Sequence, residues 1–312
     1  MRKTFANVQN RTMAKPKRSG KKQVDEVTTV ATYAGIFTVH SAGAQISKWD
    51  SSKFGPLIFS PRKAVYEVGE SPHGGIPICF PWFGQPPPLP DDDVAPLGGP
   101  RADYKHGFAR LLNWRKTHDE QSDSTWRVTY RLTNKDVPKK IAKVQHFKAD
   151  FTALFSKDRL TLTLKVENTG KETFCYESAF HTYFRVHDVR RVQVDGLEGA
   201  SYVDTAKRDE PTLVQDGPIT FGETVDRIFD TTQTPRIVDP SIGRVISVES
   251  ENAGTTIVWN PGPEDVKELS DLTKSEWKQF VCVETGNARE NAVTLPPHHC
   301  HTVEVAYQVE RL

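Results

Sequence analysis

The sequence predicts an all-β fold, a large antiparallel β-sandwich, and two observations carry this prediction. Short runs of β-branched, aromatic and aliphatic residues alternate with polar residues, which is the pattern of strands with one buried face. Turn sequences close these runs, for example Asn-Thr-Gly at 168–170 and Asn-Pro-Gly at 260–262. Because the runs are regularly spaced and no segment predicts a long helix, we expect two large sheets packed face to face.

Five runs show the strand pattern most clearly: 126–132, 160–166, 244–248, 255–259 and 302–309. In the second run the even-numbered residues are Leu or Val and the odd-numbered residues are Thr or Lys. Successive side chains of a strand point to opposite faces, so this strand should have one buried face and one wetter face. Residues 265–277 have room for one or two helical turns.

The 312 residues are compatible with one large β domain, because sandwiches often exceed 200 residues as a single unit. We expect a single β-sandwich domain over residues 25–312, preceded by a disordered basic arm at residues 1–24. Residues 85–105 are rich in Pro, Gly and Asp and predict a long loop. Such a loop is either a functional lid or binding edge, or a tolerated surface insertion.

The net charge of +1 hides an asymmetry between this arm and the rest of the chain. Residues 1–24 contain eight Lys or Arg and no acid, which leaves 41 − 8 = 33 basic against 40 acidic residues, or −7, in the remainder. The basic run 15–22 suits a solvated tail better than a nuclear or nucleic-acid-binding signal, because charge runs at termini are usually tails. A mildly acidic body favours no nucleic-acid partner.

The composition is that of a globular protein, with 37% hydrophobic and 26% charged residues. No apolar run approaches the ~18 residues of a membrane span, and no hydrophobic segment near the start predicts a secretory signal. The cysteines at positions 79, 175, 282 and 300 form no C-x-x-C pair, so reduced thiols are expected. We therefore expect a cytoplasmic monomer without a membrane partner.

Two segments about a hundred residues apart contain a possible acid/base pair. His181 lies among aromatic residues in 177–186, and Glu284 lies within the apolar segment 280–286. A histidine titrates near pH ~6.5 and can give or take a proton, and a carboxylate can act as a base. From these residues alone, a hydrogen-bonded core histidine remains the alternative for His181. A carboxylate in an apolar strand is rarely buried without a partner or a role.

Together with segments 74–84 (Gly-Gly-Ile-Pro-Ile-Cys-Phe-Pro-Trp-Phe-Gly) and 106–110 (His-Gly-Phe-Ala-Arg), these residues carry a family resemblance. From about residue 30 to the C-terminus the chain resembles the hexose-6-phosphate mutarotases (glucose-6-phosphate 1-epimerases) of the aldose-1-epimerase superfamily. The resemblance implies a galactose-mutarotase-like β-sandwich. It also implies that His181 protonates the ring oxygen of the sugar while Glu284 takes the proton of the anomeric hydroxyl, with no cofactor and no metal.

The resemblance further implies a set of substrate-binding residues. Arg110 corresponds to the family's phosphate-binding arginine, and a guanidinium suits a phosphate dianion because its donors are planar and bidentate. A surface salt bridge is the alternative role for Arg110. His106 is expected to hydrogen-bond sugar hydroxyls, and Asp226 matches a substrate-contacting aspartate. Glycines 74 and 75 should form a tight turn at the edge of the cleft.

The sequence departs from the family pattern in three places. His73 stands where an arginine usually helps to hold phosphate, and Lys105 stands where the residue before the His-Gly motif is usually uncharged. Lys105 would restore the charge lost at His73, so we include both residues in the predicted substrate site. Residues 298–301 (His-His-Cys-His) replace a polar turn; consecutive residues of an extended chain point apart, which disfavours a tetrahedral metal site.

The sequence therefore predicts an isomerase that interconverts the α and β anomers of hexose 6-phosphates, chiefly glucose 6-phosphate, with this small sugar phosphate as its partner. Two alternatives remain open at this stage. If His73 abolishes phosphate binding, the protein is a mutarotase for unphosphorylated aldoses. A non-catalytic sugar-phosphate-binding module is the other alternative, although binding alone does not need both His181 and Glu284.

Overall fold

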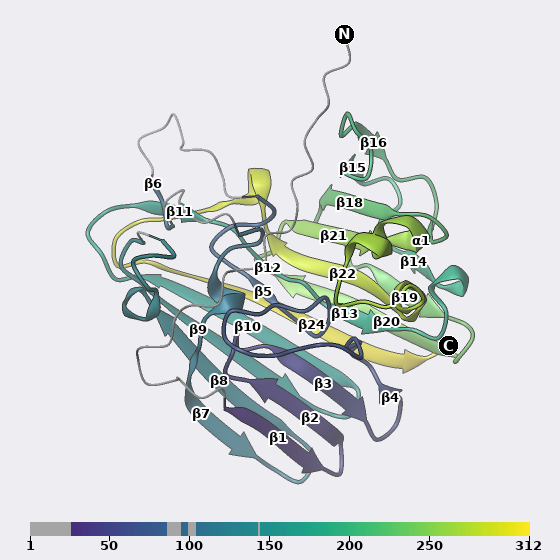
Figure 1. Ribbon diagram of the computed structural model, residues 1–312, viewed down its shortest axis with the longest axis horizontal. Coiled ribbons are helices and arrows are strands. Elements are labelled where there is room, and N and C mark those ends of the chain that lie inside the picture. Colours follow the sequence, from purple (N-terminus) through teal and green to yellow (C-terminus); the bar gives the residue numbers. More distant parts are fainter. Residues whose placement is uncertain (1–25, 86–94, 99–103, 143) are drawn as a thin grey trace.

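The computed structural model describes residues 26–85, 95–98, 104–142 and 144–312 (Figure 1). Within these residues the fold is dominated by antiparallel strands, which confirms the predicted all-β class. The predicted arm at 1–24 lies outside the described residues, so the division of the chain at residue 25 stays a prediction. No helix in the described part of the chain has both the length and the apolar character needed to cross a membrane.

A nine-stranded sheet forms one layer of the described structure and contains four of the five predicted runs. Its strands, in spatial order, are β17 (Ile219–Thr220), β14 (Gln193–Asp195), β19 (Arg236–Asp239), β20 (Arg244–Glu251), β24 (Cys300–Arg311), β10 (Arg159–Asn168), β9 (Phe147–Phe155), β8 (Trp126–Thr133) and β7 (Arg115–Gln121). In β10, residues 160, 162, 164 and 166 are buried, as the alternating pattern predicts.

An eight-stranded sheet carries the fifth run, at 255–259, and most of the candidate site. Its strands are β16 (Thr212–Val214), β15 (Ser201–Asp204), β18 (Val225–Asp230), β21 (Thr255–Asn260), β22 (Phe280–Asn287), β12 (Ser178–Phe180) and β5 (Ile78–Cys79), with β13 (Tyr183–Arg185) paired to the other end of β22. Figure 1 shows its strands β15, β16, β18 and β21 in green at the upper right and β22 in yellow-green below them.

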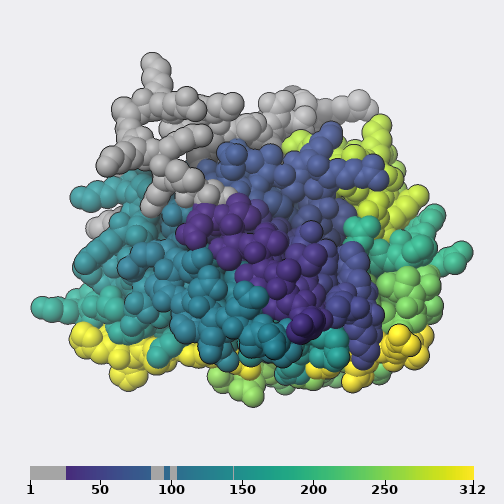
Figure 2. All heavy atoms as spheres, turned by 90° about the horizontal axis from the view of Figure 1, so that it is seen from below, coloured from purple at the N-terminus to yellow at the C-terminus, as the bar shows by residue number. Residues whose placement is uncertain are grey.

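Two smaller sheets complete the described strands. A four-stranded sheet contains β1 (Val27–Thr32), β2 (Gly35–His40), β3 (Ile46–Ser51) and β4 (Gly55–Pro56), and a three-stranded sheet contains β23 (Val293–Leu295), β11 (Phe174–Tyr176) and β6 (Ala95–Pro96). Figure 2 shows the purple and blue residues of the first of these sheets on one side of the molecule, beside teal residues. Most of the long loop predicted at 85–105 lies outside the described residues, at 86–94 and 99–103; at 95–96 a strand is found instead, because β6 pairs in parallel with β11 there and Leu97 is buried.

Helical structure is limited to short pieces in the described residues. These are η1 (Ala109–Leu111), η2 (Asn134–Asp136), η3 (Val189–Arg191), α1 (Gly262–Asp265), η4 (Val266–Glu268), η5 (Glu276–Gln279) and η6 (Arg289–Asn291). The predicted one or two helical turns within 265–277 correspond to η4 and the start of η5.

The core lies between the nine-stranded sheet and the other sheets. Phe37 of β2 stacks on Phe155 of β9 with ring centroids 4.9 Å apart. Phe184 of β13 meets Tyr307 of β24 edge to face at 4.9 Å, and the Tyr307 hydroxyl is 2.5 Å from that of Thr182. Aromatic pairs of this kind stabilise a core beyond their buried area.

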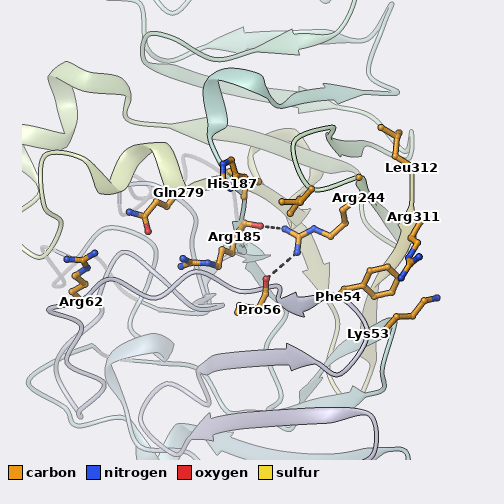
Figure 3. A pocket seen from close by; sticks show the side chains of 13 residues that line it. Lys53, Phe54, Pro56, Arg62, Arg185, His187, Arg244, Gln279, Arg311 and Leu312 are labelled. Atoms are coloured by element: carbon orange, nitrogen blue, oxygen red, sulfur yellow. Dashed lines mark hydrogen bonds between the residues drawn. The ribbon is translucent and has the colours of Figure 1, made fainter.

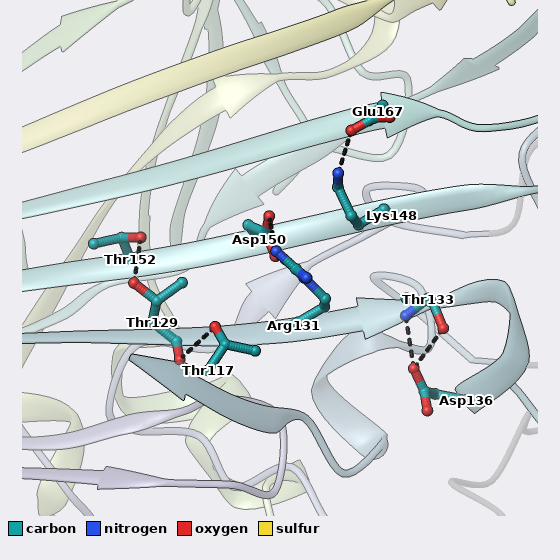
Figure 4. A network of polar contacts seen from close by, with 9 residues as sticks. All are labelled: Thr117, Thr129, Arg131, Thr133, Asp136, Lys148, Asp150, Thr152 and Glu167. Atoms are coloured by element: carbon teal, nitrogen blue, oxygen red, sulfur yellow. Dashed lines mark hydrogen bonds and ion pairs between the residues drawn. The ribbon is translucent and has the colours of Figure 1, made fainter. Parts of the chain in front are cut away.

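The opposite face of the nine-stranded sheet bears cross-strand polar pairs (Figure 4). The Arg131 guanidinium donates two hydrogen bonds to the Asp150 carboxylate, at 2.6 and 2.8 Å, and the Thr129 and Thr152 hydroxyls are 2.9 Å apart. Side chains directly opposite each other on neighbouring strands interact in this way. These pairs satisfy the hydrogen-bonding groups on the outer face of the sheet, and the candidate site residues lie on the other sheet.

The alternation along β13 determines which face of the eight-stranded sheet holds the site. Because Phe184 packs against the nine-stranded sheet, its neighbour Tyr183 points to the other face. Tyr183 pairs in register with Cys282, and Cys282 pairs with Trp259, so the three side chains share that face. Glu284 follows Cys282 by two residues and therefore lies on the same face.

Candidate active site

The structure brings His181 and Glu284 together. His181 lies between β12 and β13, and its main-chain NH donates to the carbonyl of Pro77. Its ring atom Nε2 is 3.3 Å from Oε1 of Glu284 on β22, and the two side chains are 10% and 1% exposed. The His181 ring also stacks on Tyr183, with centroids 4.8 Å apart and planes 6° from parallel. The pair is thus held rigidly at a nearly dry position.

Each member of this pair keeps one polar atom without a protein partner. Among the described residues, Nδ1 of His181 and Oε2 of Glu284 are buried and make no hydrogen bond, and the same holds for Nε of Arg110. An unmade buried hydrogen bond costs about 1–3 kcal/mol, so such atoms are uncommon in a core. Polar atoms of this kind are suited to a ligand that carries hydroxyl groups.

Burial pushes both members of the pair toward their neutral forms. The pKa of His181 lies well below its usual value because of burial, with the nearby charges of His106, Arg110 and His73 adding to the effect. The pKa of Glu284 lies well above its usual value because of burial and then the charge of Asp226, while Arg110 opposes the shift. The same single proton can therefore lie on the carboxyl group, or on the imidazole as an ion pair, without changing the net charge.

A turn at residues 105–110 brings three further predicted residues to the pair. His106 and Gly107 both have positive φ, 60° and 71°, and a Cβ on Gly107 would lie 2.1 Å from the Phe80 carbonyl oxygen. This turn places the ring of His106 edge to face with that of His181, at 5.5 Å between centroids. Nδ1 of His106 accepts a hydrogen bond from the NH of Gly84, at 3.2 Å. Nε2 therefore carries the proton whenever the His106 ring is neutral.

His106 is held in this neutral form. Burial, followed by the charges of Arg110, Lys105 and His73, lowers its pKa to about 3. Arg110 donates from Nη2 to the main-chain oxygen of Lys105, at 2.7 Å, so the guanidinium is tied to the same turn. The exposed Lys105 side chain and the partly buried Arg110 thus make this turn cationic.

The structure pairs His73 with a carboxylate that the sequence reasoning missed. Both the ring atom Nδ1 and the main-chain NH of His73 contact the carboxylate of Asp271, at 2.8 and 2.7 Å. Burial would raise the pKa of Asp271, but its hydrogen bonds and charge interaction with His73 outweigh burial and lower it. Asp271 remains ionised, so it offsets any positive charge on His73. The contribution of His73 to phosphate binding stays a prediction.

Asp226 stands beside the pair on the same sheet. It is opposite Trp259 in the register of β18 and β21, and its charge contributes to the raised pKa of Glu284. Burial raises the pKa of Asp226 itself to about 6, although contact with Thr205 and the charges of Arg289 and Lys105 act in the other direction. Two carboxyl groups near each other cannot both ionise easily, which is a frequent feature of acid/base sites.

We expect Asp226→Asn to stabilise the protein at high pH and much less at low pH. A group whose folded pKa is raised contributes stability below its unfolded pKa and loses it as the pH rises through the folded value. For Asp226 that window runs from its ordinary value of 3.8 to about 6. Removing the charge should therefore increase the free energy of unfolding by about 1–3 kcal/mol at about pH 8 relative to about pH 4. Equal changes at both pH values, measured by urea unfolding, would contradict this assignment.

Three site residues gave no usable signal in the sequence. The carboxylate of Glu177 accepts from the main-chain NH of Phe83, at 2.8 Å, and from that of Arg289, at 2.5 Å, so it joins two loops at the edge of the site. The Trp259 ring meets His181 edge to face at 5.9 Å. Asp271 holds His73. Each contact depends on strand pairing between distant segments, although Glu177 directly precedes the His181 motif.

Residues 298–301 show separate contacts rather than a common centre. Nδ1 of His301 is 3.0 Å from the Tyr176 hydroxyl, and Nδ1 of His299 is 2.9 Å from the Pro297 carbonyl oxygen. His298 has a positive φ of 64° at a turn before β24. Among the described residues, no group of three or more His, Cys, Asp or Glu side chains has the geometry of a metal site.

Comparison with known proteins gives a consistent family signal. The model of the aldose 1-epimerase family matches residues 36–308. An Escherichia coli (strain K12) protein named "Putative glucose-6-phosphate 1-epimerase" is 30% identical over 269 residues, which cover 85% of each chain. A protein of Cenchrus ciliaris with the same name is 29% identical over 268 residues, covering 83% of this chain and 77% of that one.

Solved structures agree with the fold. A structure from Salmonella typhimurium, described as a "putative mutarotase", superposes with a TM-score of 0.78 at 25% identity and covers 92% of this chain and 91% of that one. A galactose mutarotase-like protein from Lactobacillus casei superposes with a TM-score of 0.68 at 14% identity, covering 91% and 100% of the two chains. The second similarity concerns the fold alone, and it confirms the predicted galactose-mutarotase-like architecture.

Proposed function

The chain belongs to the aldose 1-epimerase family, and from this premise we propose that it interconverts the α and β anomers of hexose 6-phosphates, chiefly glucose 6-phosphate. The observation that carries the proposal is the buried contact between His181 and Glu284, each with one polar atom that no described residue uses. A binding module without catalysis would not need an acid and a base in contact in a dry site.

The proposed reaction moves two protons: one is added to the ring oxygen and one is removed from the anomeric hydroxyl. The ring oxygen and the anomeric hydroxyl are both bonded to C1, so two groups in contact with each other can reach both. His181 in its charged form donates a proton to the ring oxygen while the Glu284 carboxylate takes the proton of the hydroxyl. The C1–O5 bond breaks, and the open-chain aldehyde remains beside a neutral His181 and a protonated Glu284.

Rotation about the C1–C2 bond then presents the other face of the aldehyde. The C5 hydroxyl attacks C1, its proton returns to His181, and Glu284 returns its proton to the carbonyl oxygen, which gives the opposite anomer. The raised pKa of Glu284 and the lowered pKa of His181 favour the neutral pair that accompanies the open chain. The shifts therefore act in the direction of the net proton transfer that accompanies ring opening, from the imidazole to the carboxyl group.

Arg110 and Lys105 support the choice of a phosphorylated sugar. The NH at Arg110 Nε is buried without a partner in the described part of the chain, and Nη2 already holds the Lys105 carbonyl. A guanidinium fixed in this way can meet a phosphate with little further loss of rotamer freedom. We propose that the phosphate binds here, with His106 and Asp226 directed at the sugar hydroxyls.

One observation favours the second candidate, a mutarotase for unphosphorylated aldoses. The Asp271 carboxylate offsets the charge of His73 at the position where the family resemblance leads us to expect an arginine. A comparison of glucose 6-phosphate with glucose, followed by NMR anomer exchange, distinguishes the two. A kcat/KM at least about tenfold higher for the phosphorylated sugar supports the main proposal, and equal or reversed values support the second.

We further propose that the protein works as a cytoplasmic monomer with a small sugar phosphate as its partner. All four cysteines are free, three of them are partly or fully buried, and burial raises the pKa values of Cys79 and Cys282. Thiols in this form are slow nucleophiles and are compatible with a reducing compartment.

Activity should not depend on a metal ion, because each proposed step is a proton transfer between side chains and sugar. We expect the anomerisation rate after dialysis against EDTA to stay within about twofold of the untreated rate. Adding zinc afterwards should not increase it. A rate that falls at least about tenfold with EDTA and returns with zinc would show that a metal takes part.

A further inference from the structure

A cavity lies away from the candidate active site, where the four-stranded, eight-stranded and nine-stranded sheets meet. Its volume is about 910 Å³, and it opens to the surface (Figure 3). Arg185 of β13 contributes to its wall and pairs in register with Phe280, four residues before Glu284 on β22. Four residues of a strand span about 13 Å. Phe280 also packs on Tyr183 and Phe59, so aromatic rings stand between the cavity and the pair.

The lining of this cavity is cationic. It includes the basic side chains of Lys53, Arg62, Arg185, Arg244 and Arg311 together with His187, and it includes no Asp or Glu side chain. None of the five forms an ion pair within residues 26–85, 95–98, 104–142 and 144–312. Five like charges around one concave surface raise its positive potential and attract anions.

Two carboxylates near the wall are already engaged with backbone NH groups. Asp239 accepts from the main-chain NH of His187, at 2.9 Å, and of Ser241, at 3.2 Å. Glu276 accepts from the main-chain NH of Arg62, at 3.0 Å, and of Thr273, at 2.6 Å. These oxygens stabilise loops and form no ion pair with the guanidinium groups within the described residues, but the charge of Asp239 still acts on Arg244 and that of Glu276 on Arg62.

One cation is built rigidly into the wall. The guanidinium of Arg244 donates to the carbonyl oxygens of Pro56, at 3.2 Å, and Arg185, and the residue is 4% exposed. Burial lowers the pKa of Arg244, and Arg185 contributes to the same shift while Asp239 opposes it. Retaining an arginine that is desolvated and close to another arginine costs stability. Such a cost is frequent at binding sites, and the two main-chain contacts also fix the guanidinium in position.

The cations form a row rather than a cluster. Figure 3 shows Arg62 at one end of the cavity, Arg185 and Arg244 in the middle, and Arg311 with Lys53 at the other end. A single phosphate group can contact only part of such a row, whereas a chain of phosphates can contact all of it. We propose that this cavity binds a linear oligophosphate anion, either inorganic triphosphate or the triphosphate chain of a nucleotide. Phe54 also lines the cavity, but the Lys53 Nζ lies 4.6 Å from its ring centroid, so a base in the second case would share the ring with that ammonium group.

The test is calorimetric titration of the full chain with sodium triphosphate and, separately, with ATP, at about 0.15 M salt and with EDTA present. Arg62→Gln and Arg311→Gln remove the two ends of the row, and both residues are exposed, so the fold should survive. Each change should raise Kd for triphosphate at least about fivefold, and the double variant should raise it by about the product of the two. Tighter binding of ATP than of triphosphate identifies the nucleotide; equal affinities identify the inorganic chain.

The double variant Arg127→Gln/Lys165→Gln is the matched control, because it removes two exposed cations from the nine-stranded sheet. It should change Kd by less than about twofold. Anomerisation of glucose 6-phosphate should be unchanged in all of these variants, so this test stands apart from that of the proposed function. The proposal is overturned if wild-type protein shows no saturable binding at about 1 mM triphosphate, or if the control weakens binding equally. Displacement of triphosphate by glucose 6-phosphate would also overturn it.

Discussion

Replacing His181 with asparagine should lower kcat for anomerisation at least about 100-fold, because positioned acid/base groups contribute roughly 10²–10⁴-fold each. Asparagine keeps a hydrogen-bonding group near Glu284 but cannot transfer a proton. Glu284→Gln should have an effect of similar size for the same reason. Neither change should lower the melting temperature strongly, because each removes a buried titratable group that is already driven toward its neutral form. Turnover is measured by NMR exchange between the two anomers.

The chain supplies a matched control for both substitutions. Nε2 of His118 and Oε2 of Glu120 on β7 are also 3.3 Å apart, but their side chains are 52% and 68% exposed. His118→Asn and Glu120→Gln should leave kcat within about twofold of the wild type. If either His181→Asn or Glu284→Gln turns over nearly as fast as its control, the acid/base assignment is wrong.

Arg110→Ala should raise KM for glucose 6-phosphate by about 10- to 150-fold while changing KM for free glucose much less. This range corresponds to a charged hydrogen bond worth about 1.5–3 kcal/mol. The comparison of two sugars is needed because Arg110 also holds the Lys105 carbonyl, so its loss can loosen the turn at residues 105–110. A loosened turn would weaken the binding of both sugars alike, whereas a lost phosphate contact would weaken only the binding of glucose 6-phosphate.

Two further variants sharpen this result. Arg110→Lys keeps the charge but loses the planar arrangement of donors, and should fall between wild type and Arg110→Ala. Asp271→Asn removes a negative charge from beside His73. It should therefore tighten the binding of glucose 6-phosphate. If Arg110→Ala weakens the binding of both sugars equally, the result would favour the mutarotase for unphosphorylated aldoses.

The sequence predicted the fold well because the decisive pattern is local. Alternation at 160–166 alone specifies which side chains of β10 are buried, and the strand at 302–309 is recognisable for the same reason. The pairing of β6 with β11 was missed because two residues of strand within a Pro- and Gly-rich segment carry no periodicity. That strand is stabilised by its pairing with β11 and not by a pattern in its own sequence.

The candidate site could be predicted only as separate motifs. Residues 177–186 and 280–286 pointed to His181 and Glu284, but their contact depends on the register of β12 and β13 with β22. The pairing of His73 with Asp271 joins residues 198 positions apart, so local patterns could not reveal it. The same holds for the pKa shifts, because burial is a property of the folded chain.

The central claim is that the His181–Glu284 pair anomerises a phosphorylated hexose, and one NMR experiment tests it most directly. Glucose 6-phosphate and glucose are placed in one tube at equal concentration, and magnetisation exchange between α and β anomers is measured for each. We expect wild-type protein to accelerate exchange of glucose 6-phosphate strongly and that of glucose at least about tenfold less. His181→Asn should abolish both accelerations. No acceleration of either sugar by the wild type, or undiminished acceleration by His181→Asn, would contradict the account.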